Sequence, residues 1–120
     1  SDYIAMHPHR LEDGLVTHPA FPVNEFQLTV PSRIDVVLQD RFDQVVLVEC
    51  KQGGVTSTHV DQIGRYLADF HKRYPEWTEP RGILVHGGAR IASPALRAYA
   101  AKRGVALVHH DLRVDFSVSG

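Results

Sequence analysis

Cysteine is almost absent from this chain of 120 residues, and the one cysteine, Cys50, excludes an intrachain disulfide and a zinc site made of several cysteines. No apolar run approaches the roughly 20 residues that a membrane-spanning helix needs, and no secretory signal is visible. The formal net charge is only −1 at pH 7, so no overall basic field indicates nucleic acid. We therefore expect a cytoplasmic protein without a membrane partner.

What is present is an ordinary globular composition, with 43% hydrophobic and 22% charged residues. A chain of this length can bury a core without disulfides, so we expect a single domain over residues 1–120. It begins abruptly at Ser1, and we expect it to be a fragment of a longer protein. The eight histidines are scattered, and none has the His-x-x-x-His spacing on a clear helix that would indicate zinc.

Apolar runs separated by glycine, proline and polar residues predict an alternation of strands and helices. The expected strands cover residues 23–30, 33–39, 44–51, 82–86 and 105–109, with a short edge strand at 112–116. The segment from His7 to Pro22 is expected to be a loop with a short helical turn. Together with two helices, these elements have the order β-β-β-α-β-α-β, which predicts an α/β sandwich around a mixed sheet.

The two helices have recognisable starts. Thr58 is the expected N-cap of the first, supported by Asp61 three residues later. Apolar residues at three- and four-residue spacing then predict one buried helix face, formed by Val60, Ile63, Tyr66, Leu67, Phe70 and Tyr74. The second helix is expected over residues 95–103, with Ser93 as N-cap and Gly104 as C-cap.

Charged residues occur where two of the expected strands should bury apolar side chains. Glu49 and Lys51 are two residues apart at the end of strand 44–51, so they point to the same face. The polar segment 39–44 is short enough for a hairpin turn, and folding the hairpin brings Asp35 near Glu49. Two carboxylates and a lysine on one face of a hairpin form a candidate site for a divalent metal.

This pattern resembles a known nuclease signature. Asp35 with Glu49-x-Lys51 is similar to the Asp…Glu-x-Lys motif of the PD-(D/E)xK nuclease superfamily, and Gln62 and Tyr66 resemble the Gln-x-x-x-Tyr motif of its RecB-like branch. Within this branch the sequence resembles the NucS/EndoMS-like endonucleases that act on mismatches, whose C-terminal catalytic domain has similar spacings. The resemblance covers about residues 10–110. It implies a restriction-endonuclease-like α/β sandwich that hydrolyses phosphodiester bonds in DNA with a metal ion.

The same resemblance implies metal ligands. Asp35, one oxygen of Glu49 and the backbone carbonyl of Cys50 would hold Mg²⁺ or Mn²⁺, which prefer oxygen ligands. The family usually adds an acid from a helix before the first strand, for which Asp2 and Glu12 are loose candidates.

The remaining motif residues would assist the reaction. Lys51 would orient or help to deprotonate the attacking water, or stabilise the pentacoordinate phosphate. Gln62 and Tyr66 lie one helical turn apart and share a face. Gln62 would hydrogen-bond the water or a phosphate, and Tyr66 would brace Lys51 or the backbone. A homodimer or an upstream DNA-binding domain would supply much of the DNA affinity, because the domain itself is nearly neutral.

Other interpretations of these residues remain open. Glu49 and Lys51 can form a solvated ion pair at a strand end, Tyr66 can be a core residue, and Gln62 can face solvent. The alternative function is a catalytically inactive nuclease-fold domain used for nucleic-acid binding or assembly. A further alternative is an unrelated α/β domain with a small-ligand pocket near Gly87 and Gly88, because glycines after a strand can approach phosphates closely.

Overall fold

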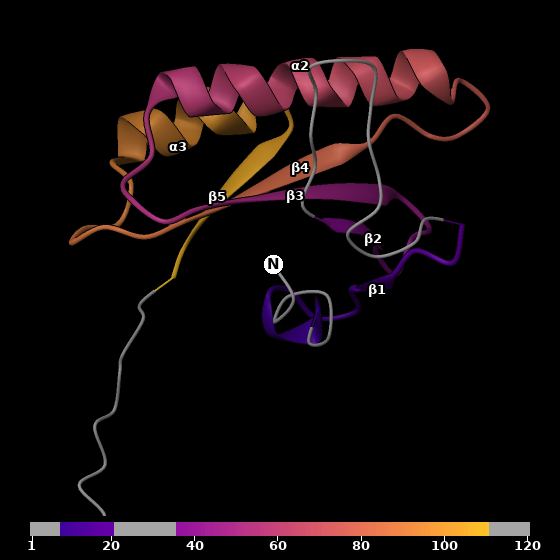
Figure 1. The fold of residues 1–120 in the computed structure, drawn as a ribbon, viewed down its shortest axis with the longest axis horizontal. Coiled ribbons are helices and arrows are strands. Elements are labelled where there is room, and N and C mark those ends of the chain that lie inside the picture. The colour runs from indigo at the N-terminus through magenta and orange to yellow at the C-terminus, as the bar shows by residue number, and fades with distance from the viewer. Residues whose placement is uncertain (1–7, 21–35, 111–120) are drawn as a thin grey trace, which may run out of the picture.

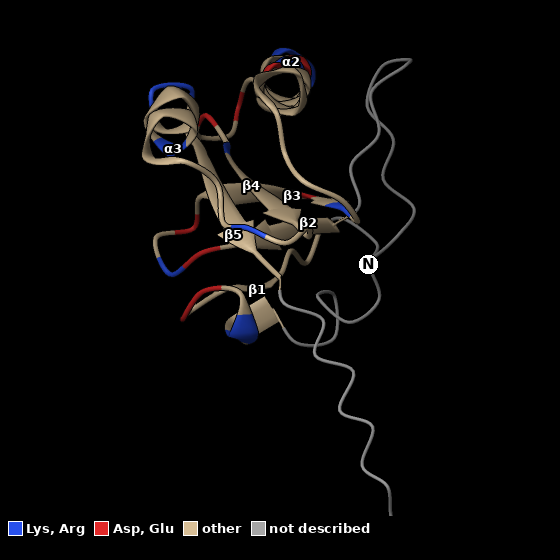
Figure 2. Cartoon of the chain, turned by 90° about the vertical axis from the view of Figure 1, so that its left-hand side faces the viewer, with Lys and Arg blue, Asp and Glu red and all other residues tan. Residues whose placement is uncertain are grey.

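The computed structural model describes residues 8–20 and 36–110. In these ranges a five-stranded sheet has the strand order β1-β2-β3-β4-β5. Both helices lie on the same side of this sheet, as the two perpendicular views show (Figure 1 and Figure 2). The elements are the 3-10 helix η1 (Pro8–Arg10), β1 (Val16–Thr17), β2 (Val36–Gln39), β3 (Val45–Lys51), α2 (Ser57–Arg73), β4 (Arg81–His86), α3 (Pro94–Ala101) and β5 (Val105–His109). The predicted α/β sandwich around a mixed sheet is confirmed.

The observed elements follow the predicted order, but the first strand is a different one. β1 is a two-residue strand that pairs antiparallel with β2, and it lies in the segment for which the sequence predicts a loop. That prediction is wrong because two residues are too few to show an alternating pattern. The strands predicted at residues 23–30 and 112–116 lie outside the described residues.

The predicted hairpin is present between β2 and β3. The two strands pair antiparallel, with Val36 opposite Val48 at the end away from the turn. Asp40 shapes the turn, because its Oδ1 accepts hydrogen bonds from the backbone N–H groups of Phe42 (2.9 Å) and Gln44 (3.0 Å). β3 then runs parallel to β4, and β4 parallel to β5, because α2 and α3 are crossover connections.

The first predicted helix is present but begins one residue before its predicted N-cap. Thr56, and not Thr58, is the N-cap, and the Thr56 N–H donates to Nδ1 of His59 at 3.1 Å. The ring of His59 therefore takes the place of the Glu or Gln of a usual capping box. Asp61 lies beyond the first turn, where its carboxylate accepts a hydrogen bond from the Tyr99 hydroxyl at 2.6 Å and links α2 to α3.

The second predicted helix begins where the sequence places it. Ser93 is the N-cap, and its Oγ accepts a hydrogen bond from the N–H of Leu96 at 3.1 Å. The helix ends at Ala101, so the predicted end is two residues too late, and the prediction of Gly104 as C-cap is wrong because Lys102 is the C-cap. Gly104 has a φ of +72° in the turn that leads into β5, a conformation that favours glycine.

The sheet separates two apolar cores. The core on the helix side contains Leu47 of β3 and the buried face of α2. The core on the other side contains Val48 and is covered by Leu15, from the segment just before β1. Because successive residues of a strand point to opposite faces, Glu49 continues the row of Leu47 and points to the helix side. Charged residues lie mainly on helices and loops, and the strands carry few of them (Figure 2).

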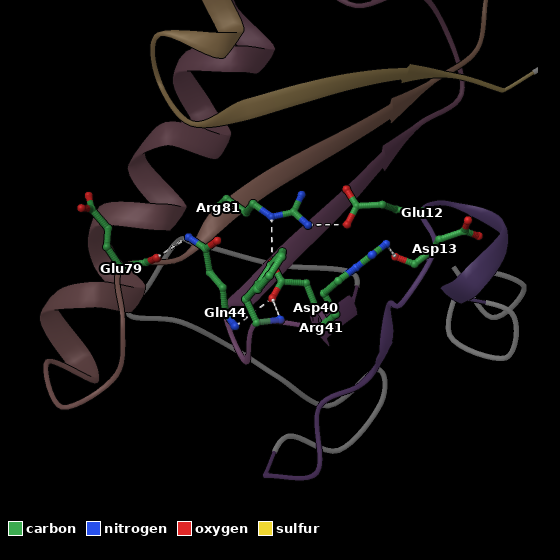
Figure 3. A network of polar contacts seen from close by, with 8 residues as sticks. Glu12, Asp13, Asp40, Arg41, Gln44, Glu79 and Arg81 are labelled. Carbon is green, nitrogen blue, oxygen red and sulfur yellow. Dashed lines mark hydrogen bonds and ion pairs between the residues drawn. The ribbon is translucent and has the colours of Figure 1, made fainter.

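A polar network closes the edge of the sheet where β4 begins (Figure 3). Arg81 donates from Nε to Oδ2 of Asp40 at 3.3 Å, and its Nη2 pairs with Glu12. Burial alone would raise the pKa of Asp40, but the hydrogen bonds from the turn amides and from Arg81 outweigh it and hold this pKa below its usual 3.8. Glu12 therefore belongs to this network, at the opposite edge from Glu49, and its candidacy as a further catalytic acid is wrong.

Candidate functional site

Glu49 and Lys51 form an ion pair at the carboxyl end of β3. The Nζ of Lys51 lies 3.1 Å from Oε1 of Glu49, with both side chains on the helix side of the sheet. Glu49 is only 6% exposed, whereas the side chain of Lys51 is 29% exposed. A carboxylate is rarely buried to this extent unless it is paired or binds a cation. The interpretation as a solvated strand end is therefore wrong for Glu49.

The backbone carbonyl of Cys50 faces away from β4. Along a strand, successive carbonyls point to opposite sides. The carbonyl of Lys51 accepts a hydrogen bond from the N–H of Gly87, which follows β4, at 3.1 Å. The Cys50 carbonyl is therefore directed to the side of β2, which begins at Val36, opposite Val48.

These oxygen donors fit a hard divalent cation. A buried carboxylate and a backbone carbonyl from adjacent residues, Glu49 and Cys50, are ligands of the kind that Mg²⁺ and Mn²⁺ take. Asp35, the other predicted ligand, lies outside the described residues, and so does Asp2. Within residues 8–20 and 36–110, no three or more His, Cys, Asp or Glu side chains gather as a metal-binding group.

The two motif residues of α2 differ in burial. Tyr66 is 7% exposed and belongs to the core cluster that also contains Leu47 and Leu84. Leu84, another member of that cluster, is the register partner of Glu49 on β4. Gln62 is half-buried one turn earlier on the same helix. Packing in the core thus accounts for Tyr66, and the catalytic roles of both residues stay predictions.

A pair of glycine loops adjoins the same edge of the sheet. The N–H of Gly87 donates to the carbonyls of both Lys51 (3.1 Å) and Gly53 (3.0 Å). A Cβ on Gly87 would collide with the carbonyl oxygen of Gln52, so only glycine fits there. The backbone of this loop is therefore packed against protein and tied to Lys51. The sequence does show a double glycine after each of the two strands, but it does not show that the loops touch.

No family model matches the sequence, and no curated protein matches it. Among the solved structures that match the fold, three do so over 92% of this chain. They are a repair endonuclease from Pyrococcus abyssi (21% identity, TM-score 0.71), an EndoMS–dsDNA complex (18%, 0.67) and EndoMS in its apo form (20%, 0.67). The chain has the fold of these endonucleases.

This likeness confirms, at the level of the fold, the predicted resemblance to NucS/EndoMS-like endonucleases, and it does not agree with an unrelated α/β domain. The chain spans 44%, 42% and 44% of the three matching chains, which is less than half of their length. In the part of the chain that the structure describes, no helix has the length and apolar character needed to cross a bilayer.

Proposed function

We propose that this chain is a metal-dependent endonuclease domain that hydrolyses phosphodiester bonds in DNA. The observation that carries the proposal is the buried Glu49, paired with Lys51 at 3.1 Å, at the carboxyl end of β3 in a fold shared with repair endonucleases. Burying a carboxylate at the end of an apolar strand makes folding less favourable, because the charge loses its hydration. A functional need for that carboxylate explains why the cost is tolerated.

Glu49 and the carbonyl of Cys50 are the proposed ligands of Mg²⁺ or Mn²⁺, together with Asp35. Asp35 directly precedes Val36 in the sequence, and Val36 is the partner of Val48, the residue before Glu49. When bound, the metal would polarise a scissile phosphodiester and offset the charge that develops in the transition state.

Lys51 is the proposed partner of the attacking water. Its partly exposed ammonium group can reach a substrate that a buried residue cannot touch, while Glu49 fixes its position. From there it would orient the water or stabilise the negative charge of the pentacoordinate phosphate. Gln62 would add a hydrogen bond to the water or to a phosphate. Tyr66, which is buried, would act only by bracing the site.

DNA is the proposed partner, and the rest of its binding surface would come from a homodimer or from an upstream domain. The chain has a formal net charge of −1 and spans less than half of the matching endonucleases. Phosphate neutralisation supplies most non-specific affinity for DNA. We therefore expect weak, strongly salt-dependent binding by this chain alone.

One observation favours the alternative of a catalytically inactive domain that binds nucleic acid or takes part in assembly. Lys51 already gives Glu49 a cationic partner, so this buried carboxylate does not require a metal for its charge. The two functions differ in metal binding. An endonuclease site should bind Mn²⁺ through Glu49, and a purely structural ion pair should not.

The decisive experiment is cleavage of labelled single-stranded, duplex, branched and mismatched DNA with Mn²⁺. Glu49→Gln and Lys51→Met are the test variants, because each removes a charge and keeps the side-chain length. Lys72→Met is the matched control, since Lys72 is exposed near the C-terminal end of α2. The proposal is supported if cleavage is lost in Glu49→Gln and Lys51→Met and is retained in Lys72→Met.

Calorimetric titration of Mn²⁺ separates the remaining outcomes. Binding by the parent chain that disappears in Glu49→Gln would locate the metal even where cleavage is slow. A folded parent that neither cleaves DNA nor binds Mn²⁺ would contradict the proposed endonuclease function of this chain and favour the alternative. Cleavage by Lys51→Met at the parent's rate would remove Lys51 from the mechanism.

A further inference from the structure

Three side chains lie in one row across the carboxyl edge of the sheet. Lys51 of β3 is in register with His86 of β4, and His86 with His109 of β5. All three continue the strand positions that face the helices, since Leu84 and Leu107, two residues before the histidines, pack in the helix-side core. His86, in the middle of the row, is only 2% exposed.

Each histidine holds one carbonyl of the loop that follows β4. Nδ1 of His86 lies 3.0 Å from the carbonyl oxygen of Gly87, and Nε2 of His109 lies 2.9 Å from that of Gly88. A carbonyl only accepts, so both rings donate. These contacts fix opposite tautomers, with the proton on Nδ1 in His86 and on Nε2 in His109. The two ring centroids are 5.2 Å apart.

The loop so held is also the anchor of Lys51. Gly87 accepts from His86 through its carbonyl and donates through its N–H to the carbonyl of Lys51 at 3.1 Å. Gly88 has a φ of +89° and lies against the backbone of Gly54. A Cβ added to Gly88 would lie 3.1 Å from the backbone nitrogen of Gly54. His86, His109 and the two glycines are called the histidine latch below.

We propose that His86 is a positioning residue for the reaction at Lys51. With His109 it holds the Gly87–Gly88 loop, and Gly87 holds the backbone of Lys51 in place. His86 is too deeply buried to touch DNA, so the latch acts through the placement of Lys51 and not through substrate binding. The catalytic consequence of the latch rests on the proposed endonuclease function, whereas its hydrogen bonds do not.

Because the two histidines donate from different ring nitrogens, the same two substitutions, to asparagine and to glutamine, should have opposite effects at the two positions. An asparagine amide can donate from near the position of Nδ1, and a glutamine amide from near that of Nε2. His86→Asn and His109→Gln therefore keep the bonds to the loop. His86→Gln and His109→Asn remove them while introducing the same kinds of side chain. Unfolding midpoints of all four variants check that each one is folded.

Two readouts test the proposal on the whole chain with Mn²⁺. His86→Gln should lower kcat about tenfold with little change in KM, since a small displacement of a catalytic group acts on the chemical step. His86→Asn should retain most of the parent's kcat, because it keeps the hydrogen bond to the Gly87 carbonyl. Hydrogen exchange at the Gly87 amide should speed up in His86→Gln and His109→Asn, and stay near the parent rate in His86→Asn and His109→Gln.

The outcomes separate the latch from the proposed function. Equal exchange and equal kcat in His86→Asn and His86→Gln would overturn the latch. If His86→Gln does not fold, the half-buried His109 pair makes the same comparison. If the parent chain does not cleave DNA, the proposed function fails, and the exchange pattern alone decides whether the histidines hold the loop.

Discussion

Glu49 is buried and Lys51 is partly exposed to solvent, although the two side chains lie on the same face of β3, two residues apart, with the Lys51 Nζ 3.1 Å from the Glu49 Oε1. The pair marks the point at which an apolar strand changes into a site. Metal binding and stability place opposite demands on this pair. A buried carboxylate can bind a metal ion, but its burial lowers the stability of the fold.

Glu49→Gln is expected to leave the free energy of unfolding unchanged or to raise it, while Lys51→Met lowers it by about 1–2 kcal/mol. The asymmetry arises because Glu49 is buried and Lys51 is partly exposed, so removing the lysine takes a cation from a buried carboxylate. Urea unfolding of both variants and of the double variant measures the coupling. A larger loss for Glu49→Gln than for Lys51→Met would contradict this.

Asp40→Ala should lower the free energy of unfolding by about 2–4 kcal/mol, because it removes the acceptor of three hydrogen bonds inside the folded turn. Those bonds come from Phe42, Gln44 and Arg81. Asp43→Asn is the matched control, since Asp43 is exposed in the same turn and its φ of 63° suits asparagine. Equal losses in the two variants would mean that the turn does not depend on Asp40.

The same carboxyl group gives a pH dependence with a definite sign. The folded-state pKa of Asp40 lies below its usual 3.8, so its contribution is complete above that value and is lost as the pH falls through the folded-state pKa. Parent and Asp40→Asn should therefore differ most in stability near neutral pH and converge in strong acid. Denaturant midpoints between pH 7 and pH 2.5 test this convergence.

The sequence was sufficient to predict the strands and helices that have strong apolar patterns. It did not predict helix ends reliably where two neighbouring residues could each serve as the cap. The apolar run of β3 and the stripe of α2 specify both elements, and the polar turn specifies the hairpin. The N-cap is ambiguous because Thr56 and Thr58 both precede the stripe, and His59 completes the capping box in place of a Glu or Gln.

The site was less accessible to sequence reasoning because its features depend on register and packing. The spacing shows that Glu49 and Lys51 share a face, but burial of Glu49 depends on how α2 covers the sheet. The role proposed for His86 depends on its register with Lys51 and on a loop contact from β5. No spacing along the chain encodes either relationship.

His18 should make the fold less stable in mild acid. Burial lowers the pKa of its imidazole below the usual 6.5, and its Nδ1 accepts a hydrogen bond from the N–H of Ala20 at 3.1 Å. The stability from the neutral ring is complete above pH 6.5 and is lost as the pH falls through the lower folded-state pKa. His18→Gln should flatten this loss between pH 7 and pH 5, whereas His71→Gln, at an exposed position, should not.

Fluorescence provides the measurement. Trp77 is the single tryptophan of the chain, and the ring of His18 stacks on it at 4.8 Å. Protonation of His18 should change the Trp77 emission in the folded protein, and His18→Gln should abolish that change. An emission that titrates identically in parent and variant would assign the transition to another group.

Gly87 and Gly64 should respond in opposite ways to alanine. An added Cβ at Gly87 collides with the carbonyl oxygen of Gln52, so Gly87→Ala has to displace the loop that anchors Lys51. At Gly64, inside α2, no neighbouring atom lies within 4 Å of an added Cβ, so Gly64→Ala should raise the free energy of unfolding by about 0.5–1 kcal/mol.

Thermal unfolding and DNA cleavage together test this pair. Gly87→Ala should lower the unfolding midpoint and, under the proposed function, reduce kcat by more than its stability loss explains at temperatures where it is fully folded. Gly64→Ala should raise the midpoint without reducing cleavage. If Gly87→Ala were as stable and as active as the parent, the tight packing between the two glycine loops would have no part in holding Lys51, because the collision would have been relieved at no cost to the site.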